Sequence, residues 1–241
     1  MVKLKTAALI PARYASTRLP AKLIQDLGGK SVIQQTYLSA IDTGLFDRVV
    51  VATDHELIAN QIKALGGEVF LSQGLHESGS DRIAEAAQDI DTAIVINIQG
   101  DEPFLDRDTL ERLIRAFDDP NVKVASVMYQ ISKDVAHNPN AVKVVLDEND
   151  DALYFSRSLI PFDRDGKHDQ FYWKHIGIYA YRKEILMAFT TWPKSKLEQI
   201  EMLEQLRILE RGIKIRMIST KHQAIAIDTA EDLELARKLW K

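Results

Sequence analysis

The 241-residue sequence contains no cysteine. Disulfide bonds, zinc ribbons, iron–sulfur clusters and thiol nucleophiles are therefore excluded. Long apolar runs are missing as well: none approaches the roughly 20 residues that a membrane-spanning helix needs, and residues 1–10 hold no apolar core of a signal peptide. We therefore expect a soluble, cytoplasmic globular protein with no membrane partner.

An excess of basic residues is also absent. Lys and Arg number 31 against 35 Asp and Glu, and the formal net charge is −4. Proteins whose main task is binding nucleic acid usually have a basic face and a basic isoelectric point, so we expect no nucleic-acid partner. A local site for a smaller anion remains compatible with this balance.

Short apolar runs alternate with helical stretches through the first 130 residues, and no repeat or Pro/Gly/Ser linker interrupts them. The predicted strands are 6–11, 48–53, 68–71, 93–98 and 124–131, and the predicted helices are 31–43, 56–65, 78–89 and 106–117. Continuous apolar strands, each followed by a helix, indicate a parallel sheet covered on both faces. The sequence therefore predicts a doubly wound, mostly parallel α/β nucleotide-binding sheet, with ligands beyond the carboxyl ends of its strands.

The pattern changes after residue 141. Two runs, 142–146 and 152–155, flank the turn-rich sequence DENDD and predict a hairpin, and 175–181 predicts a further strand. The remaining predictions are helices at 182–190, 196–211 and 229–240 and strands near 214–218 and 224–227. We expect a single domain over 1–241, with a nucleotide-binding part (1–130), an inserted antiparallel lobe (141–181) and a return to the sheet (182–241).

Three cations follow the first predicted strand within ten residues: Arg13, Arg18 and Lys22. By count alone, a solvated basic loop explains them about as well as a binding site. Their loop, however, leaves a strand that is expected near the middle of the sheet, where α/β proteins bind ligands. The glycine patterns G-x-G-x-x-G and G-x-x-x-x-G-K-[ST] are missing. Charged side chains must therefore do much of any phosphate binding, for which Arg and Lys are suited.

Two aspartates follow other predicted strands, Asp101 after 93–98 and Asp228 after 224–227. Both are expected at the ligand-facing edge of the sheet. Two carboxylates, together with phosphate oxygens and water, suit Mg²⁺. Asp is also a favoured helix N-cap, and from the residues alone capping is the better explanation of Asp228.

The second half offers further polar candidates. Arg157 ends a predicted strand and is able to bind a carboxylate in bidentate fashion. His175 and Tyr179 are four positions apart on another strand, so they share one face. From the residues alone, a surface arginine, a hydrogen-bonded core histidine and a half-buried tyrosine are the commoner explanations.

A predicted acidic helix follows. Glu198, Glu201 and Glu204 recur at a spacing of three, and Gln205 comes next. Such a run is usually a solvated face. We expect Glu198 and Glu201 to lie on the surface.

Together these motifs resemble one family. The run IPARYASTRLPAK at 10–22 is similar to the signature loop of the 3-deoxy-D-manno-octulosonate (Kdo) cytidylyltransferases. The likeness spans nearly the whole chain through VATD (51–54), SGSDR (78–82), NIQGDEP (97–103), ALYFSR (152–157), HIGIYAY (175–181), LEQIEMLEQLR (197–207) and IDT (227–229). Three details depart from the family: Ala21 replaces a glycine, His55 replaces a second Asp, and residues 73–77 are idiosyncratic.

The resemblance implies a nucleotidyltransferase that activates Kdo with CTP, giving CMP-Kdo and pyrophosphate for lipopolysaccharide biosynthesis. The residues that it implies as catalytic are Arg13, Lys22, Asp101 and Asp228, of which Asp101 and Asp228 hold Mg²⁺. The candidates for binding the nucleotide are Arg13, Arg18, Lys22, Thr53, Asp54, Ser78, Arg82 and Gln99. Those for the sugar acid are Arg157, His175, Tyr179, Glu204 and Gln205. It also implies a cytoplasmic homodimer that pairs through 141–181.

Two alternatives stay open at this point. An 8-amino derivative of Kdo differs from Kdo by one group, so the sequence does not separate the two acceptors. A non-catalytic nucleotide-binding regulator is disfavoured because the basic loop and both aspartates are present together. Sialic-acid enzymes have a different first loop, and no general base is assigned.

Overall fold

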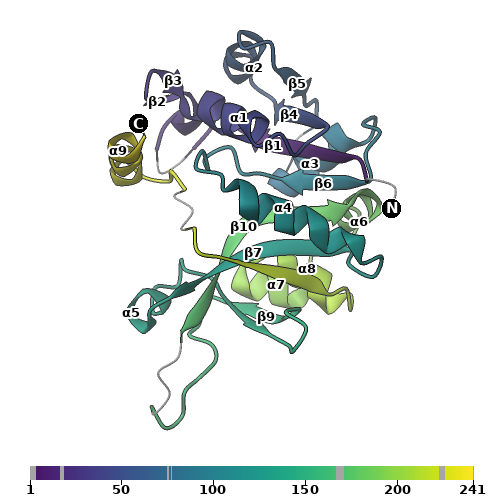
Figure 1. The fold of residues 1–241 in the computed structure, drawn as a ribbon, viewed down its shortest axis with the longest axis vertical. Coiled ribbons are helices and arrows are strands. Elements are labelled where there is room, and N and C mark those ends of the chain that lie inside the picture. The colour runs from purple at the N-terminus through teal and green to yellow at the C-terminus, as the bar shows by residue number, and fades with distance from the viewer. Residues whose placement is uncertain are drawn as a thin grey trace.

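The computed structural model describes residues 4–16, 19–74, 76, 78–166, 171–222 and 226–240. Figure 1 shows a twisted sheet with helices on both sides and a smaller strand region that projects from it. No helix among the described residues is long and apolar enough to cross a membrane.

Within the described residues, seven strands form the path of the main sheet, in the order β11-β7-β10-β6-β1-β4-β5. Their bounds are β1 Thr6–Ala12, β4 Arg48–Thr53, β5 Glu68–Leu71, β6 Ile94–Asn97, β7 Val124–Ile131, β10 Tyr172–Arg182 and β11 Ile215–Thr220. Neighbours in this order are parallel, except that β10 runs antiparallel to β6 and β7. The predicted doubly wound, mostly parallel α/β fold is confirmed.

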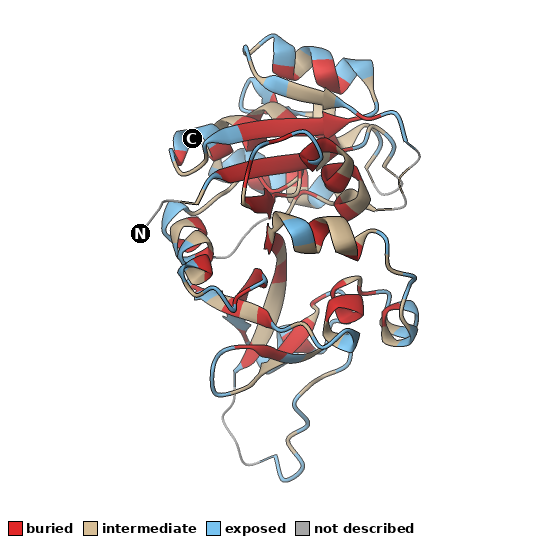
Figure 2. Cartoon of the chain, turned by 90° about the vertical axis from the view of Figure 1, so that its right-hand side faces the viewer, coloured by how far each residue is buried: buried red, intermediate tan, exposed pale blue. Residues whose placement is uncertain are grey.

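Side chains of the central strands alternate between two hydrophobic layers. Along β1, Ala8 and Ile10 face one layer, and Ala7 and Leu9 face the other. The first layer packs against α1 (Val32–Asp42), α2 (Glu56–Lys63), α4 (Arg107–Arg115) and α9 (Ala230–Leu239). The second packs against α3 (Gly79–Ala87), α6 (Lys183–Phe189) and α8 (Gln205–Glu210). This double burial, visible as red strands in Figure 2, explains why the strands are continuous apolar runs.

The predicted hairpin consists of β8 (Lys143–Leu146) and β9 (Ala152–Ser156), which pair antiparallel. The Asp147 carboxylate closes its turn by accepting the backbone N–H groups of Asn149 at 2.8 Å and Asp151 at 2.9 Å. Strand β8 also pairs with β10, so the hairpin is joined to the main sheet. The boundaries at 130, 141 and 181 stay a prediction.

Short elements escaped the sequence prediction. A small hairpin of β2 (Asp26–Leu27) and β3 (Lys30–Ser31) turns through Gly28 and Gly29, both at positive φ. It leads into α1, whose N-cap is the Ser31 side chain. The others are the 3₁₀ turns η1 (Lys22–Ile24) and η2 (Ala116–Asp118) and the one-turn helix α5 (Lys133–Ala136).

Two predictions of regular structure were wrong. The helix expected over 196–211 is divided into α7 (Lys196–Glu201) and α8, because Met202 adopts the left-handed conformation with φ of 54° and ends α7. The strand expected over 224–227 is also not formed where the structure describes it: Ala226 and Ile227 are irregular, and residues 224 and 225 lie outside the described residues. The irregular backbone at Ile227 instead donates to the Asp101 carbonyl at 2.9 Å.

Candidate active site

A cavity of about 820 Å³ lies beyond the carboxyl ends of β1 and β6. The loop after β1 and the turn after β6 form two of its walls, and the chain entering α9 forms a third. A hydrogen bond ties the turn after β6 to α1, because the Thr36 hydroxyl of α1 donates to the Gly100 carbonyl at 2.9 Å. A side chain at Gly100 would meet the Pro11 carbonyl at 3.0 Å, so glycine permits this close packing.

The chain brings Lys22, Asp101 and Asp228 together in this cavity. The Lys22 Nζ donates to the Asp101 carboxylate and, at 2.9 Å, to Oδ1 of Asp228. Burial by itself lowers the pKa of Lys22, but the charges and hydrogen bonds of Asp101 and Asp228 outweigh it and raise this pKa. Both carboxylates thus converge on one cation. Capping does not account for Asp228, because the side chain that caps α9 is that of Thr229.

Other parts of the basic loop have different placements. Arg13 is exposed and lines the same cavity. Arg18 lies outside the described residues. Ala21, where the family usually has glycine, adopts φ of 51° in the left-handed region, which is strained for a residue with a Cβ. The loop therefore keeps the glycine-like conformation.

Sequence reasoning missed Glu102. This side chain lines the cavity next to Asp101, is buried, and its Oε2 finds no partner among the described residues. Burial, followed by the charge of Asp101, raises the pKa of Glu102 to about 8. Its place directly after Asp101 was the only signal in the sequence.

A smaller cavity of about 90 Å³ adjoins Arg13 and is lined by Ser78, Arg82 and Gln99. Ser78 caps α3 and thereby fixes the start of the helix that presents Arg82. The Asp54 carboxylate accepts from Arg82 Nη2 at 2.7 Å, while Nη1 is buried without a partner among the described residues. A buried donor of this kind needs an acceptor, so this guanidinium is suited to a ligand.

Thr53 and Asp54, two of the predicted nucleotide residues, line neither this cavity nor the one at Lys22. Asp54 acts on Arg82, and Thr53 is fully buried with its hydroxyl accepting the backbone N–H of His55 at 3.2 Å. His55 in turn caps α2 through Nδ1, which accepts from Leu57. Its ring stacks on Tyr14 at 4.0 Å between centroids. The histidine thus serves as a helix cap, a role that suits the aspartate usual in the family.

A third cavity of about 210 Å³ brings four of the predicted sugar residues together: His175, Tyr179, Glu204 and Gln205. Burial is the main cause of two pKa shifts here: it lowers the pKa of His175 to about 3 and raises the pKa of Glu204. The Glu204 carboxylate accepts from the Ser80 hydroxyl at 3.0 Å.

Buried polar atoms in the wall of this third cavity lack a hydrogen-bond partner among the described residues. Oδ1 of Asn97 and Nε2 of Gln205 are buried and form no hydrogen bond with any described residue. Buried polar groups in native proteins nearly always find partners. An acceptor and a donor left open in one small cavity are what a polyhydroxylated ligand requires.

The guanidinium of Arg157 is not in this cavity. It donates to three backbone carbonyls, those of Glu201 at 2.9 Å, Pro139 at 3.2 Å and Met202 at 3.4 Å. The Glu201 carboxylate accepts from the Arg157 backbone N–H at 3.0 Å. Arg157 therefore ties the end of β9 to the break between α7 and α8, directly before Glu204.

Glu198 and Glu201 were expected to be solvated surface residues, and this was wrong, because both form hydrogen bonds with neighbouring elements. Glu198 is buried and forms a two-pronged pair with Arg207, at 2.7 Å to Nε and 2.5 Å to Nη2. Glu201 accepts from the Ser156 hydroxyl at 2.6 Å. The spacing of three along the sequence did not reveal that β9 and α8 cover this side of α7.

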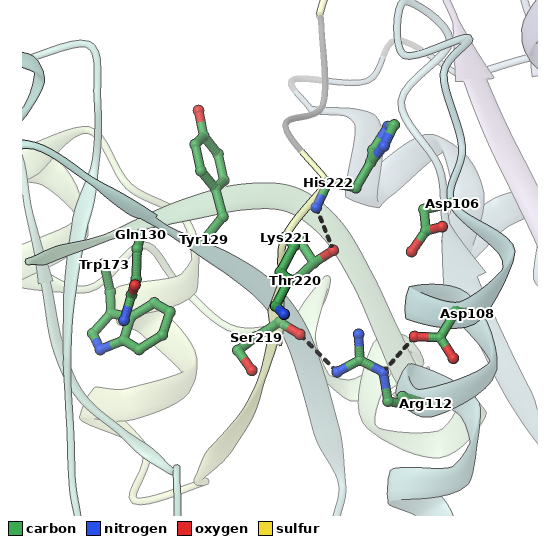
Figure 3. Close-up of a pocket in the computed structure, with 10 residues that line it drawn as sticks. All are labelled: Asp106, Asp108, Arg112, Tyr129, Gln130, Trp173, Ser219, Thr220, Lys221 and His222. Atoms are coloured by element: carbon green, nitrogen blue, oxygen red, sulfur yellow. Dashed lines mark hydrogen bonds and ion pairs between the residues drawn. The ribbon is translucent and has the colours of Figure 1, made fainter.

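A fourth cavity, of about 930 Å³, contains none of the predicted site residues. Figure 3 shows Tyr129 and Trp173 on one side of it and the α4 residues Asp108 and Arg112 on the other. Arg112 is already engaged, because it donates to Asp108 at 3.0 Å and to the Ser219 carbonyl at 2.7 Å. This cavity is therefore distinct from the candidate active site.

Comparison with known proteins gives a consistent result. A sequence model of the cytidylyltransferase family matches residues 7–215. A 3-deoxy-manno-octulosonate cytidylyltransferase from Flavobacterium johnsoniae is 53% identical, covering 99% of each chain, and one from Bacteroides thetaiotaomicron is 45% identical over 99% of each. A solved CMP:2-keto-3-deoxy-manno-octonic acid synthetase complexed with CTP has a TM-score of 0.93 at 41% identity, covering 98% of each chain.

The chain belongs to the 3-deoxy-manno-octulosonate cytidylyltransferase family. The resemblance seen in the motifs is thus confirmed, and the chain is an enzyme of the nucleotidyltransferase class. HddC from Yersinia pseudotuberculosis, with a TM-score of 0.70 at 16% identity, shares the fold of this cytidylyltransferase.

Proposed function

We propose that this cytidylyltransferase transfers the CMP group of CTP to Kdo and releases pyrophosphate. One observation supports this most directly: Gln99 lines all three cavities of the candidate site. The small cavity at Arg82, the cavity at Lys22 and the cavity at His175 therefore meet at one residue. With the pyrimidine base in the first cavity, the triphosphate in the second and the sugar acid in the third, the α-phosphate of CTP and the sugar hydroxyl lie close together.

The reaction is a substitution at phosphorus. The anomeric hydroxyl oxygen of Kdo forms a bond to the α-phosphorus of CTP, the bond from that phosphorus to the β-phosphate bridging oxygen breaks, and the hydroxyl proton is lost to solvent. Such a step depends mostly on alignment and on stabilising negative charge. Lys22 and Arg13 supply the cations beside the triphosphate, and the Arg82 Nη1 supplies a donor for the base.

We propose Asp101 and Asp228 as ligands of Mg²⁺. Among the described residues, no cluster of three His, Asp or Glu side chains suits a metal ion. The two carboxylates do converge on one cation, Lys22 Nζ, and a carboxylate pair completed by phosphate oxygens and water is a usual Mg²⁺ environment. When bound, the ion would neutralise phosphate charge and lower the pKa of the attacking hydroxyl.

The setting of the reaction follows from its substrates. CTP is a cytoplasmic nucleotide, so we place the enzyme in the cytoplasm, where its product would supply lipopolysaccharide biosynthesis. A homodimer is supported by apolar side chains of the 141–181 segment. Phe162 and Phe171 are 80% and 64% exposed.

The decisive assay is pyrophosphate release from CTP and Kdo in the presence of Mg²⁺. We expect turnover with this combination, loss of turnover in EDTA, and little release with ATP or GTP in place of CTP. Competition between Kdo and 8-amino-Kdo identifies the preferred acceptor by the ratio of the two kcat/KM values. Binding of CTP without release of pyrophosphate in the presence of either sugar would instead favour the non-catalytic regulator.

Replacing Arg157 with alanine is expected to raise the KM for Kdo about tenfold, the value of a good hydrogen bond, while the KM for CTP stays within twofold. The reason is that Arg157 anchors the backbone of residues 201 and 202 next to the sugar cavity. Arg216→Ala is the matched control. Arg216 donates to the Asp151 carboxylate at 2.7 Å, and this pair lies away from the site. An unchanged KM for Kdo in Arg157→Ala would remove this residue from sugar recognition.

A further inference from the structure

The imidazole of His175 has a partner that no sequence motif indicated. Ser126, in the middle of β7, is fully buried, and its Oγ lies 3.1 Å from Nε2 of His175. The same Oγ lies 2.9 Å from the carbonyl oxygen of Ile178 and 3.3 Å from that of Ile176. These groups meet because the register of β10 with β7 shifts between Ile176 and Tyr179. Irregularities of this kind often re-aim side chains next to active sites.

The single hydroxyl proton of Ser126 decides the tautomer of His175. A carbonyl oxygen only accepts, so the contact with Ile178 requires the Ser126 hydroxyl to donate. With its proton used there, the hydroxyl accepts at the imidazole, and Nε2 of His175 must donate. Burial lowers the pKa of His175 to about 3, with the charge of Lys174 acting in the same direction, so the ring is neutral near pH 7. Nδ1 then has a free lone pair.

The ring is also held in one orientation. The Phe155 ring packs against it edge-on, with 5.2 Å between centroids and an interplanar angle of 77°. The Tyr179 ring lies at the same centroid distance on a tilted plane. His175 lines the 210 Å³ cavity, and its Nε2 is engaged with Ser126. Any hydrogen bond from the ring to a ligand must therefore be accepted at Nδ1.

We propose that Ser126 is a positioning residue that keeps His175 in the Nε2–H tautomer, so that Nδ1 accepts a hydrogen bond from a hydroxyl group of the sugar acid. The sugar part of this inference rests on the proposed function. Without the Ser126 hydroxyl, both neutral tautomers become accessible. The tautomer with Nδ1–H presents a donor to a hydroxyl that is already donating, so only part of the protein is competent to bind and the apparent affinity falls.

The test uses the full-length protein labelled with ¹⁵N at histidine. A long-range ¹H–¹⁵N spectrum distinguishes a protonated from a bare ring nitrogen, and the His175 signals are assigned by their loss in His175→Gln. In ligand-free wild-type protein we expect Nε2 protonated and Nδ1 bare. In Ser126→Ala we expect mixed tautomers and about a tenfold rise in the KM for Kdo, with kcat and the KM for CTP within threefold.

Thr109→Ala is the matched control, because Thr109 is a buried hydroxyl whose partners are Thr220 and Asp106, remote from the sugar cavity. This variant should keep the wild-type His175 spectrum and KM for Kdo. A bare Nε2 in wild-type protein overturns the proposal. So does a Ser126→Ala enzyme whose KM for Kdo equals that of the control.

A second pair of variants tests the proposal even where Ser126→Ala does not fold. Asn at position 175 places an amide near the position of Nδ1, whereas Gln places it near Nε2. We expect His175→Asn to have the lower KM for Kdo, and the reverse order contradicts the assignment. Failure of the proposed function shows separately: wild-type protein that releases no pyrophosphate from CTP and Kdo removes the sugar from the inference, while the tautomer is still read in the ligand-free spectrum.

Discussion

Replacing Asp101 with alanine is expected to lower kcat by about 10³-fold, the scale on which removing one electrostatic group from an active site acts. The carboxylate is one of two that converge on Lys22, and its loss removes one of the two protein ligands proposed for Mg²⁺. The fold should tolerate the change. Lys22 keeps its bond to Asp228, and the backbone carbonyl of residue 101 still accepts from the Ile227 N–H. Pyrophosphate release and thermal unfolding measure the two effects.

The matched control for this experiment is Asp119→Ala. Its carboxylate accepts from the backbone N–H of Asn121 at 2.9 Å in an exposed turn before β7. This variant should lose about 1 kcal/mol of stability, as for a single hydrogen bond, with kcat unchanged. Near-normal turnover by Asp101→Ala would disprove the metal assignment. An equal loss of kcat in Asp119→Ala would attribute the effect of Asp101→Ala to folding.

Replacing Glu198 with alanine is expected to destabilise the protein by about 3–5 kcal/mol, because it leaves a buried charge unpaired. The side chains of Glu198 and Arg207 are 6% and 8% exposed. Arg207 lies over the Phe189 ring at 4.4 Å and also donates to the carbonyls of Phe189 and Trp192, so protein groups cover most of the guanidinium. Urea denaturation measures the change in the free energy of unfolding.

An exposed Arg–Glu pair provides the comparison. Glu234 and Arg237 are 62% and 37% exposed and lie 2.6 Å apart on α9, so Glu234→Ala should cost less than about 1 kcal/mol. In the double variant Glu198→Ala/Arg207→Leu, part of the lost stability should return, because no unpaired charge remains buried. A Glu198→Ala protein as stable as Glu234→Ala would show that the pair does not hold α7 against α8.

Much of the architecture was predictable because it depends on local patterns. Residues of β1 are buried on both sides of the sheet, so the strand is one apolar run, and the helix caps Ser31, Ser78 and Thr229 stand where helical periodicity begins. The helix break at Met202 was not predictable from such patterns. The apolar and acidic spacing continues through it, and the partners of this segment lie on β9, far away in the sequence.

The sequence by itself determined the alternation of strands and helices, the family, and which loops hold charged residues of each sign. Only the tertiary structure decided which of these residues meet. Lys22 contacts aspartates 79 and 206 positions away, and Arg157 is used on backbone carbonyls although its motif indicated a carboxylate ligand. The physical reason is that helix and strand periodicity describe one element at a time. Approach between elements depends on the order of strands in the sheet and on the packing of side chains between its layers.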